Sequence, residues 1–337
     1  MRNFLAAAMI FGWSTTFALH SSADTRALGD TLVISVGTAV GGSFDAVGRV
    51  VARHYAKHLP HKPNVVVQNM PGAGGLIATN HLFNNAPQDG TFMSVIVPGV
   101  LFNQLFKEKG VRFDGTKLHW IGNPIAATAV STVFHTAPVK TWRDALSMTV
   151  LIGATGPTGP DAMVANLANS ILGTKLKVIA GYKGGQNISL AMETGEVHGR
   201  GTQTWAGWKA TNPDWVATGK LIPLWQVGRK ADPELPDVPL LHEIVSGADD
   251  RAIVLVYANV NSLGRPFAMG PTTPPETVEI FRRGFDSLMH DEAFRKDALR
   301  ISLELGPMSG EEIQAMVGEV LSLDDKLASR LKDAIRN

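Results

Sequence analysis

The feature that most constrains the fold is a regular alternation of short apolar runs with helical patterns, which starts at Thr31. Short apolar runs predict strands, and the amphipathic stretches between them predict helices. Strands are expected at 32–36, 65–67, 92–97, 130–134, 150–152, 176–179, 221–227 and 253–257. Helices are expected at about 46–59, 75–84, 160–172 and 186–194. This alternation is typical of α/β proteins that contain βαβ units and parallel sheets.

Two later segments, 274–300 and 309–335, have helical patterns with no strand between them. In the second, Ser309 and Glu312 have the spacing of a capping box at the start of a helix. The chain has 337 residues, which suggests roughly two domains of ~100–200 residues each. No internal apolar run reaches about 18 residues, so the mature chain is expected to lack a transmembrane helix.

The N-terminus differs from the rest of the chain. Arg2 precedes an apolar run from Phe4 to Trp13, and small residues follow up to Ala23. This order predicts a secretory signal peptide at 1–23 and export to the periplasm. Cleavage after Ala18 is the alternative. A membrane anchor or a core helix fits less well, because the run is too short to span a bilayer.

Composition excludes several kinds of site. The chain has no cysteine, so disulfides, thiolate catalysis and a lipid-modified cysteine are all excluded. It carries 31 basic and 30 acidic residues, and removal of the leader takes away Arg2. The mature chain therefore has no net charge when its histidines are neutral. That balance does not match a nucleic-acid-binding surface.

Three glycine-rich turns, at 37–45, 71–75 and 154–160, each lie between an expected strand and an expected helix. Glycine before a helix lets backbone N–H groups converge at the positive end of the helix dipole. One such turn often only reverses the chain, but three together suggest a shared anion site. They match neither nucleotide-binding motifs nor a nucleophile elbow, and they contain no lysine. This favours a carboxylate held by N–H groups and hydroxyls, with affinity that depends weakly on salt.

A histidine group is a possible metal site. His54 and His58 are four residues apart, and His61 follows. A helix with this spacing can present two imidazoles to one metal ion. The surrounding residues are polar, however, which favours a solvated helix surface. The sequence therefore predicts no metal and no cofactor.

Two tryptophans and one aspartate allow more than one interpretation. Trp205 and Trp208 either line a pocket or fill a core, and the sequence does not decide between these. Asp161, at an expected helix start, is more often a cap than a catalytic acid. No Ser/His/Asp order or carboxylate pair stands out, so the sequence does not indicate an enzyme.

Several stretches, taken in order, resemble the extracytoplasmic solute receptors of the tripartite tricarboxylate transporter family, also called Bug proteins. The first are GGSFDAVGRVVA, VVVQNMPGAGG and NAPQDGT. They are followed by GATGPTG, GYKGGQNISLAMETGEVHG, ATGKLIPLWQVGRKADPELPDVPLLHE, GPTTPPETVEIFRRGFDSLMHDEAFR and MSGEEI. The resemblance covers about 31–313.

The resemblance implies a periplasmic-binding-protein-like fold of type II, in which two α/β lobes, each a mostly parallel sheet flanked by helices, enclose a ligand cleft. Lobe 1 is expected at 31–124 and 250–337, and lobe 2 at 125–249, with crossing strands near 126–134 and 253–258. It also implies a monomeric, non-catalytic receptor that delivers a small organic acid to inner-membrane transporter subunits. A co-sensor for a signalling partner and an exported hydrolase are the alternatives.

The resemblance further implies the ligand-binding residues, carried over position by position, to which Trp205 is added from the tryptophan pair. They are Val40, Gly41, Gly42, Ser43, Phe44 and Asp45 in the first loop, Gly72, Ala73 and Gly74 in the second, and Thr155, Gly156, Thr158, Gly159 and Tyr182 in the other lobe. The first loop departs from the family pattern, since Ser43 replaces a glycine and Phe44 a threonine. An aliphatic di- or tricarboxylate and an aromatic acid both remain open as ligands.

Overall fold

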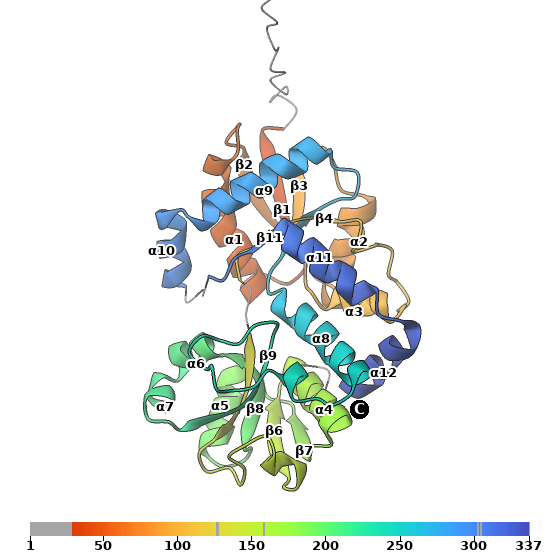
Figure 1. Ribbon diagram of the computed structural model, residues 1–337. Helices are drawn as coiled ribbons and strands as arrows, with labels where there is room; N and C mark the ends of the chain where they lie inside the picture. The colour runs from red at the N-terminus through yellow and green to blue at the C-terminus, as the bar shows by residue number, and fades with distance from the viewer. Residues whose placement is uncertain (1–28, 126–127, 158, 302, 304, 337) are drawn as a thin grey trace, which may run out of the picture.

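The computed structural model describes residues 29–125, 128–157, 159–301, 303 and 305–336, and it contains two lobes, one above the other in Figure 1. Each lobe is a β-sheet flanked by helices. The predicted signal peptide at 1–23 lies outside the described residues. Within the described ranges, no helix combines the length and the apolarity that crossing a membrane requires.

The first lobe surrounds a six-stranded sheet. Its strands are β1 (Thr31–Val36), β2 (Asn64–Asn69), β3 (Phe92–Val95), β4 (His119–Asn123), β10 (Phe267–Met269) and β11 (Met308–Ser309), in the order β11-β4-β10-β3-β1-β2. Its helices are α1 (Ser43–Tyr55), η2 (Ala56–His58), η3 (Ala73–Gly75), α2 (Leu76–Asn84), α3 (Val100–Leu105), α9 (Pro275–Met289), α10 (Glu292–Arg300) and α11 (Gly310–Leu321).

The second lobe surrounds a five-stranded sheet. Its strands are β5 (Ala129–Phe134), β6 (Val150–Ala154), β7 (Leu176–Ala180), β8 (Gly199–Thr204) and β9 (Leu221–Val227), in the order β7-β6-β8-β5-β9. Its helices are η4 (Asp144–Leu146), α4 (Pro160–Leu172), α5 (Gly185–Glu193), α6 (Trp205–Thr211), α7 (Pro213–Ala217) and η5 (Leu241–Glu243).

Both sheets are mixed, although the resemblance implies mostly parallel ones. In the first sheet, β1 runs parallel to β2 and β3, whereas β10 is antiparallel to β3 and β4, and β11 is antiparallel to β4. In the second, β6 runs parallel to β7 and β8, whereas β5 is antiparallel to β8 and β9. The reversed strands β5 and β10 follow the two passages of the chain between the lobes, so each enters its sheet from the opposite end.

The long helix α8 (Ala248–Ser262) departs most from the sequence expectation. The expected strand at 253–257 is wrong, because these residues lie inside this helix. A short apolar run cannot by itself distinguish a buried strand from a buried helix. Here Asp249 and Asp250 occupy the first turn, where the helix dipole favours acidic side chains.

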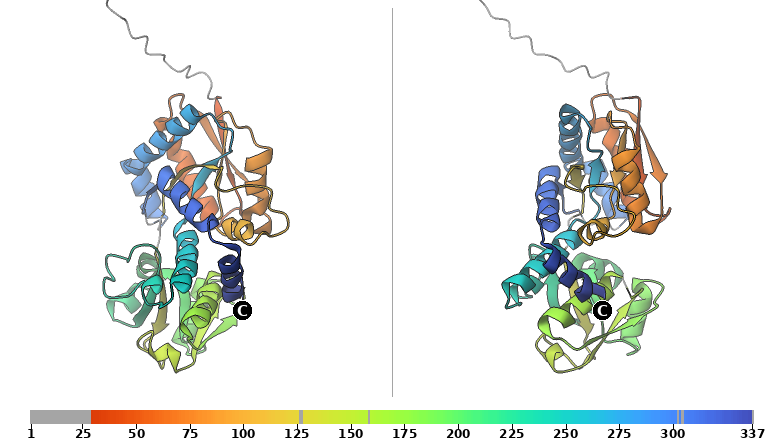
Figure 2. Two further views of the ribbon diagram at one scale, coloured as in Figure 1. Left: turned by 45° about the vertical axis from the view of Figure 1, so that its right-hand side comes forward. Right: turned by 90° about the vertical axis from the view of Figure 1, so that its right-hand side faces the viewer.

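The two C-terminal helices pack on different lobes. α11 lies against β4 of the first lobe, and its capping box is confirmed, since Ser309 N donates to Glu312 Oε2 at 2.8 Å. The last helix, α12 (Asp325–Arg336), packs instead against α4 of the second lobe (Figures 1 and 2). Expected lobe 1 thus ends in a helix that contacts the other lobe. It does so because its apolar face, which includes Leu331 and Ile335, is buried there.

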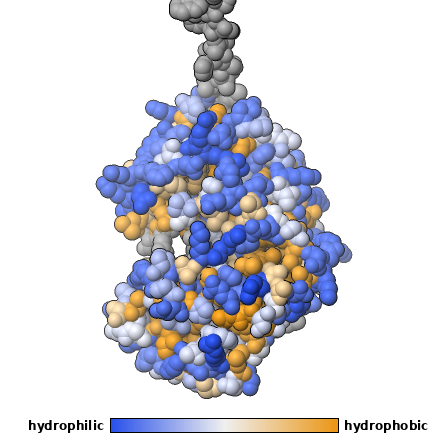
Figure 3. All heavy atoms as spheres, in the orientation of Figure 1, coloured by the Kyte–Doolittle hydropathy of each residue, from blue (hydrophilic) through white to orange (hydrophobic). Residues whose placement is uncertain are grey.

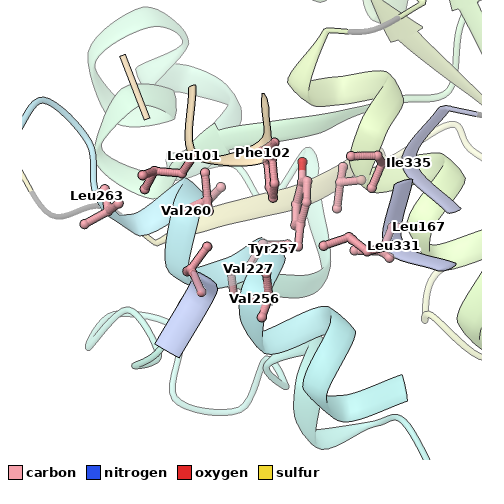
Figure 4. Close-up of a cluster of buried hydrophobic side chains, with 14 of the residues drawn as sticks. Leu101, Phe102, Leu167, Val227, Val256, Tyr257, Val260, Leu263, Leu331 and Ile335 are labelled. Atoms are coloured by element: carbon pink, nitrogen blue, oxygen red, sulfur yellow. The ribbon is translucent and has the colours of Figure 1, made fainter. Parts of the chain in front are cut away.

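A continuous apolar core joins the lobes on the side of α8 and α12 (Figure 4). Tyr257 of α8 stacks on Phe102 of α3, with ring centroids 6.0 Å apart and ring planes at 15°. Leu167 of α4 and Leu331 of α12 belong to the same core. Buried side chains in such a core are closely packed. This side of the molecule therefore holds the two lobes together.

Candidate functional site

A buried carboxylate shapes the loop between β1 and α1. The side chain of Asp45 is 4% exposed and accepts hydrogen bonds from Gly41 N at 2.9 Å, Arg49 Nε at 3.0 Å and Asn69 Nδ2 at 2.9 Å. Burial alone would raise the pKa of Asp45, but these hydrogen bonds outweigh it and hold the pKa below its usual value. Asp45 is thus occupied inside the lobe, where it positions the loop.

The rest of this loop is open to solvent. Val40 is 71% exposed, and Gly41, Gly42 and Ser43 are exposed as well. Gly42 is the N-cap of α1 and makes no side-chain cap bond. The first-turn N–H groups of a helix have no partner within the helix. The start of α1 can therefore offer donors to a ligand.

Sequence reasoning missed Arg265, in the segment between α8 and β10. Its Nη2 donates to Ser43 Oγ at 3.0 Å, although the two residues are 222 positions apart, and its Cζ lies 4.4 Å from the ring centroid of Phe44. Its Nε is buried and unpaired. The glycine turns themselves contain no lysine, but the fold brings the basic side chain of Arg265 to this loop from a distant segment. No local pattern could have shown it, because only the tertiary fold brings the segments together.

Arg265 has no acidic partner in the described part of the chain. Its Nη1 donates to its neighbour's carbonyl, Gly264 O, at 3.2 Å, and its backbone N–H donates to Asn123 Oδ1 at 3.0 Å. Burial lowers the pKa of the Arg265 guanidinium, since desolvation disfavours the charged form. An arginine remains protonated at neutral pH nevertheless. The start of α1 thus carries an uncompensated positive charge beside its own positive dipole end.

The second glycine turn lies beside the first loop. Gly72, Ala73, Gly74 and Gly75 all have positive φ, from 46° to 139°. A side-chain carbon on Gly37 would lie 3.1 Å from the Cα of Gly75. The structure thus brings the predicted residues of this turn to the end of β1 from which the first loop starts.

In the second lobe, α4 starts at Pro160 and has Gly159 as its N-cap, again without a side-chain cap bond. Gly159 N donates to Gly156 O at 3.1 Å, which closes the turn, and Thr155 is exposed. The predicted Thr158 lies outside the described residues. The two lobes thus each present an open, glycine-capped helix start.

Asp161 neither caps α4 nor faces solvent. Its Oδ1 accepts from Thr202 N at 2.7 Å, Thr202 Oγ1 at 3.0 Å and Arg200 Nε at 3.3 Å. Its side chain is 4% exposed. Asp161 therefore joins α4 to β8 and partly neutralises Arg200.

The predicted aromatic residues are less available than expected. Tyr182 O–H donates to Glu196 Oε1 at 2.7 Å, and burial together with this carboxylate raises the pKa of Tyr182 to about 12. Trp208 is fully buried in an apolar cluster of this lobe, which decides in favour of a core role. Trp205 is half-buried at the start of α6 and packs against the same cluster.

Both open helix starts lie at the boundary between the lobes. Pro160 O accepts a long hydrogen bond of 3.4 Å from Tyr257 on the connecting helix α8, and Arg265, just past that helix, reaches the start of α1. Across the described ranges, no hydrogen bond joins loop 40–45 to loop 155–160. Figure 3 shows the surface hollowed between the lobes. The starts of α1 and α4 thus lie on different lobes, and each contacts the segment that connects the lobes.

A pocket of about 570 Å³ lies elsewhere along the lobe boundary. Its walls include Arg229 and Lys230 of the second lobe, and Met308 and Met316 of the first. It adjoins β11, which is separated from β1 by β4, β10 and β3. The residues that line this pocket do not include those of the glycine loops.

The two histidines pair with Asp297 of α10 and with Asp291, the N-cap of that helix. His54 Nε2 lies 3.1 Å from Asp297 Oδ2, and His58 Nε2 lies 2.8 Å from Asp291 Oδ2. Among the described residues, no group of three or more His, Asp or Glu side chains could hold a metal ion. These histidines fix α10 onto α1.

Replacing Asp291 by Asn should lower stability at neutral pH by on the order of 1 kcal/mol. Burial would raise the pKa of Asp291, but Lys57, His58 and two backbone N–H groups hold it well below the ordinary 3.8. A depressed pKa contributes stability that is present above about 3.8 and lost as pH falls through the folded-state value. Asn still caps α10. Urea unfolding at several pH values should show the difference shrinking below about pH 4; a constant difference would contradict the assignment.

Comparison with known proteins gives a clear family match. Residues 47–327 match the model of the tripartite tricarboxylate transporter family receptor. A protein from Cupriavidus necator described as "UPF0065 protein in gbd 5'region" is 24% identical over 88% of this chain and 86% of its own length.

Several solved structures share the two-lobed fold. A TctC solute-binding protein from Polaromonas, without ligand, has a TM-score of 0.70 and 22% identity, covering 90% of this chain and 97% of its own. The protein Rpa4515 of R. palustris, solved with adipate, has a TM-score of 0.59 and 18% identity, with coverage of 90% and 97%. MatC from Rhodopseudomonas palustris, with bound malate, has a TM-score of 0.56 and 18% identity, with coverage of 90% and 98%.

These matches confirm the expected fold of a periplasmic binding protein. The family model spans most of the chain, from the first turns of α1 into α12. Family and fold are those of substrate-binding proteins, which are not enzymes. The chain belongs to the receptors of the tripartite tricarboxylate transporter family.

Proposed function

We propose that this protein is a periplasmic receptor that binds a small organic acid between its lobes and delivers it to a membrane transporter of the tripartite tricarboxylate type. Family membership and the relatives solved with adipate and with malate support a carboxylate ligand. One observation about this chain carries the proposal. Two helices of 13 residues, α1 and α4, start at the lobe boundary with glycine N-caps that make no side-chain bond.

The start of a helix is suited to a carboxylate, because free N–H groups and the positive dipole end both favour an anion. In the first lobe, the proposed donors are the N–H groups of Gly42, Ser43 and Phe44. In the second, the proposed donors are the N–H group of Gly156 and the hydroxyl of Thr155, because the Gly159 N–H group is already bonded to Gly156 O. A charge-assisted hydrogen bond contributes about 1.5–3 kcal/mol. Several of them suffice for micromolar affinity, roughly −8 kcal/mol, after association costs.

The two-lobed arrangement explains how binding would be signalled. A ligand that bonds to both walls has a higher affinity for the closed state than for the open one, and only such a difference can drive closure. A membrane subunit or a sensor could then distinguish the two states. Export through the leader at 1–23, and action as a monomer, are parts of the same proposal.

The test is a thermal shift assay on the mature protein with adipate, malate, citrate and benzoate, followed by calorimetry with the acids that raise the melting temperature. A ligand specific to the folded state adds about 2.7 kcal/mol at a hundredfold excess over Kd. The melting temperature should therefore rise by several degrees. The neutral amide of each acid, in which every carboxyl group is amidated, serves as its control. Equal shifts by acids and amides, or none by any acid, would overturn the proposal.

A further inference from the structure

The guanidinium of Arg265 lies at the start of α1, where the proposed ligand carboxylate would bind. It contacts the loop twice, through the hydrogen bond of 3.0 Å to Ser43 Oγ and through the ring of Phe44, 4.4 Å away. Both residues belong to the first turn of α1. The side chain is thus held at the same N–H groups that an anion would use.

The charges around this guanidinium favour an additional anion. Asp45 is two residues from Ser43, but its carboxylate already accepts hydrogen bonds from Gly41, Arg49 and Asn69. In the described chain, the partners of Arg265 are neutral, and its Nε is buried without any. A desolvated cation without a counter-ion is costly, and a positive helix end beside it adds repulsion. A carboxylate placed here would relieve both.

The backbone around Arg265 gives the side chain little freedom. A side-chain carbon on Gly264 would come within 1.7 Å of Ile125 O, so the two passages of the chain between the lobes touch at this point. Asn123 Oδ1 accepts hydrogen bonds from the backbone N–H groups of both Ile125 and Arg265. The backbone that carries Arg265 is therefore fixed before a ligand binds, so binding costs little conformational entropy there.

Arg200 of the second lobe also lies near a helix start, but its charge is compensated. Arg200 lies close to the start of α5, since a side-chain carbon on Gly185 would fall 2.4 Å from its Nη1. Its Nε, however, is bonded to the buried carboxylate of Asp161. Its charge is thus already compensated within the lobe, which leaves Arg265 as the stronger candidate for an incoming anion.

We propose that Arg265 is the charge-selecting residue of the cleft: its guanidinium receives a carboxylate of the ligand at the start of α1. This inference rests on the proposed function. It makes the first lobe bind by charge as well as by backbone hydrogen bonds, and it makes affinity depend on salt. If Arg265 only tied the crossing segment to α1, it would contribute neither a charge to ligand binding nor a salt dependence to the affinity.

The experiment is calorimetry on the full mature protein with adipate and malate as probes. Arg265→Gln should weaken binding roughly 10- to 150-fold, the equivalent of about 1.5–3 kcal/mol for a hydrogen bond to a charged group. Arg265→Lys keeps the charge but not the paired donors, so it should recover part of the loss. Raising ionic strength from about 0.02 M to about 0.5 M should weaken wild-type binding clearly and Arg265→Gln binding little.

Arg143→Gln is the matched control. The Cζ of Arg143 lies 4.5 Å from the ring centroid of Trp142, as Arg265 lies over Phe44, but on an exposed part of the second lobe. Arg143→Gln should therefore leave both the Kd for the probes and the salt dependence of that Kd unchanged. Ser43→Ala removes the tether but keeps the cation, so it should cost less than about tenfold.

The outcomes separate this inference from the proposed function. Wild-type protein that binds neither probe overturns both. If the wild-type protein binds a probe, and Arg265→Gln binds it with the same Kd and the same salt dependence, the inference alone is overturned. If Arg265→Gln melts too low to titrate, the comparison of wild type, Arg265→Lys and Ser43→Ala decides, because a wild-type affinity that is insensitive to salt also overturns it.

Discussion

Replacing Gly42 by valine is expected to weaken carboxylate binding by at least about a hundredfold, with the fold retained. Its backbone φ of −77° is accessible to valine, and a side-chain carbon there would meet Ala39 O at 3.6 Å and Thr38 Oγ1 at 3.8 Å, which are ordinary contacts. The branched side chain would nevertheless cover the N–H groups at the start of α1. Loss of two charge-assisted bonds corresponds to roughly 3–6 kcal/mol. Calorimetry with the tightest acid of the panel measures it.

The control for Gly42→Val is Gly247→Val. Gly247 is also a glycine N-cap without a side-chain bond, at the start of α8, with φ −92°. Its nearest neighbour would be the flexible end of Asp250, 3.2 Å away. Both variants should lose a similar, small amount of stability at the cap. Only Gly42→Val should lose affinity, and unchanged affinity in that variant would rule out the start of α1 as a binding wall.

Replacing Gly264 by alanine is expected to lower the free energy of unfolding by about 4 kcal/mol or more. The residue has φ +55°, which L-residues with a side chain disfavour, and its new carbon would fall 1.7 Å from Ile125 O. The segments that contain Ile125 and Gly264 cannot move apart easily, because the side chain of Asn123 is hydrogen-bonded to the backbone of both Ile125 and Arg265. Losses of this size are exceptional and indicate a specific clash. Urea unfolding, followed by circular dichroism, measures the change.

Gly173→Ala isolates the backbone part of that effect. Gly173 ends α4 with φ +75°, and no atom lies within 4 Å of an added carbon. The free energy of unfolding should therefore fall by only about 1–2 kcal/mol in Gly173→Ala, the cost of placing alanine in the left-handed backbone conformation. Similar losses in the two variants would mean that the crossing segments separate readily, contrary to the contact in this structure.

Local patterns predicted most regular elements well. The helix expected at 160–172 has those bounds in α4, and the expected strand at 221–227 is β9. Both have strong periodicity or composition of their own. β8, with the sequence GRGTQT, was missed because its residues are not apolar. It forms because its backbone is paired between β6 and β5, an interaction that composition does not reveal.

The glycine loops show how far the sequence could identify the candidate site. Glycine before a helix is a local feature, so the open starts of α1 and α4 were predictable from residues 37–45 and 154–160. Whether nearby side chains face the cleft is not local. Asp45 turns inward to Gly41 and Arg49, and Tyr182 donates to Glu196, because the fold supplies those partners.

The sequence by itself determined the family, the α/β class and the two helix starts, because motifs and periodicity depend on neighbours along the chain. The tertiary structure alone decided three other features. It made 253–257 part of a helix, since burial between two lobes satisfies an apolar run in either conformation. It placed α12 on the opposite lobe from α11. It also brought Arg265 to Ser43 across 222 positions, because contacts between distant segments arise only when the two passages between the lobes meet.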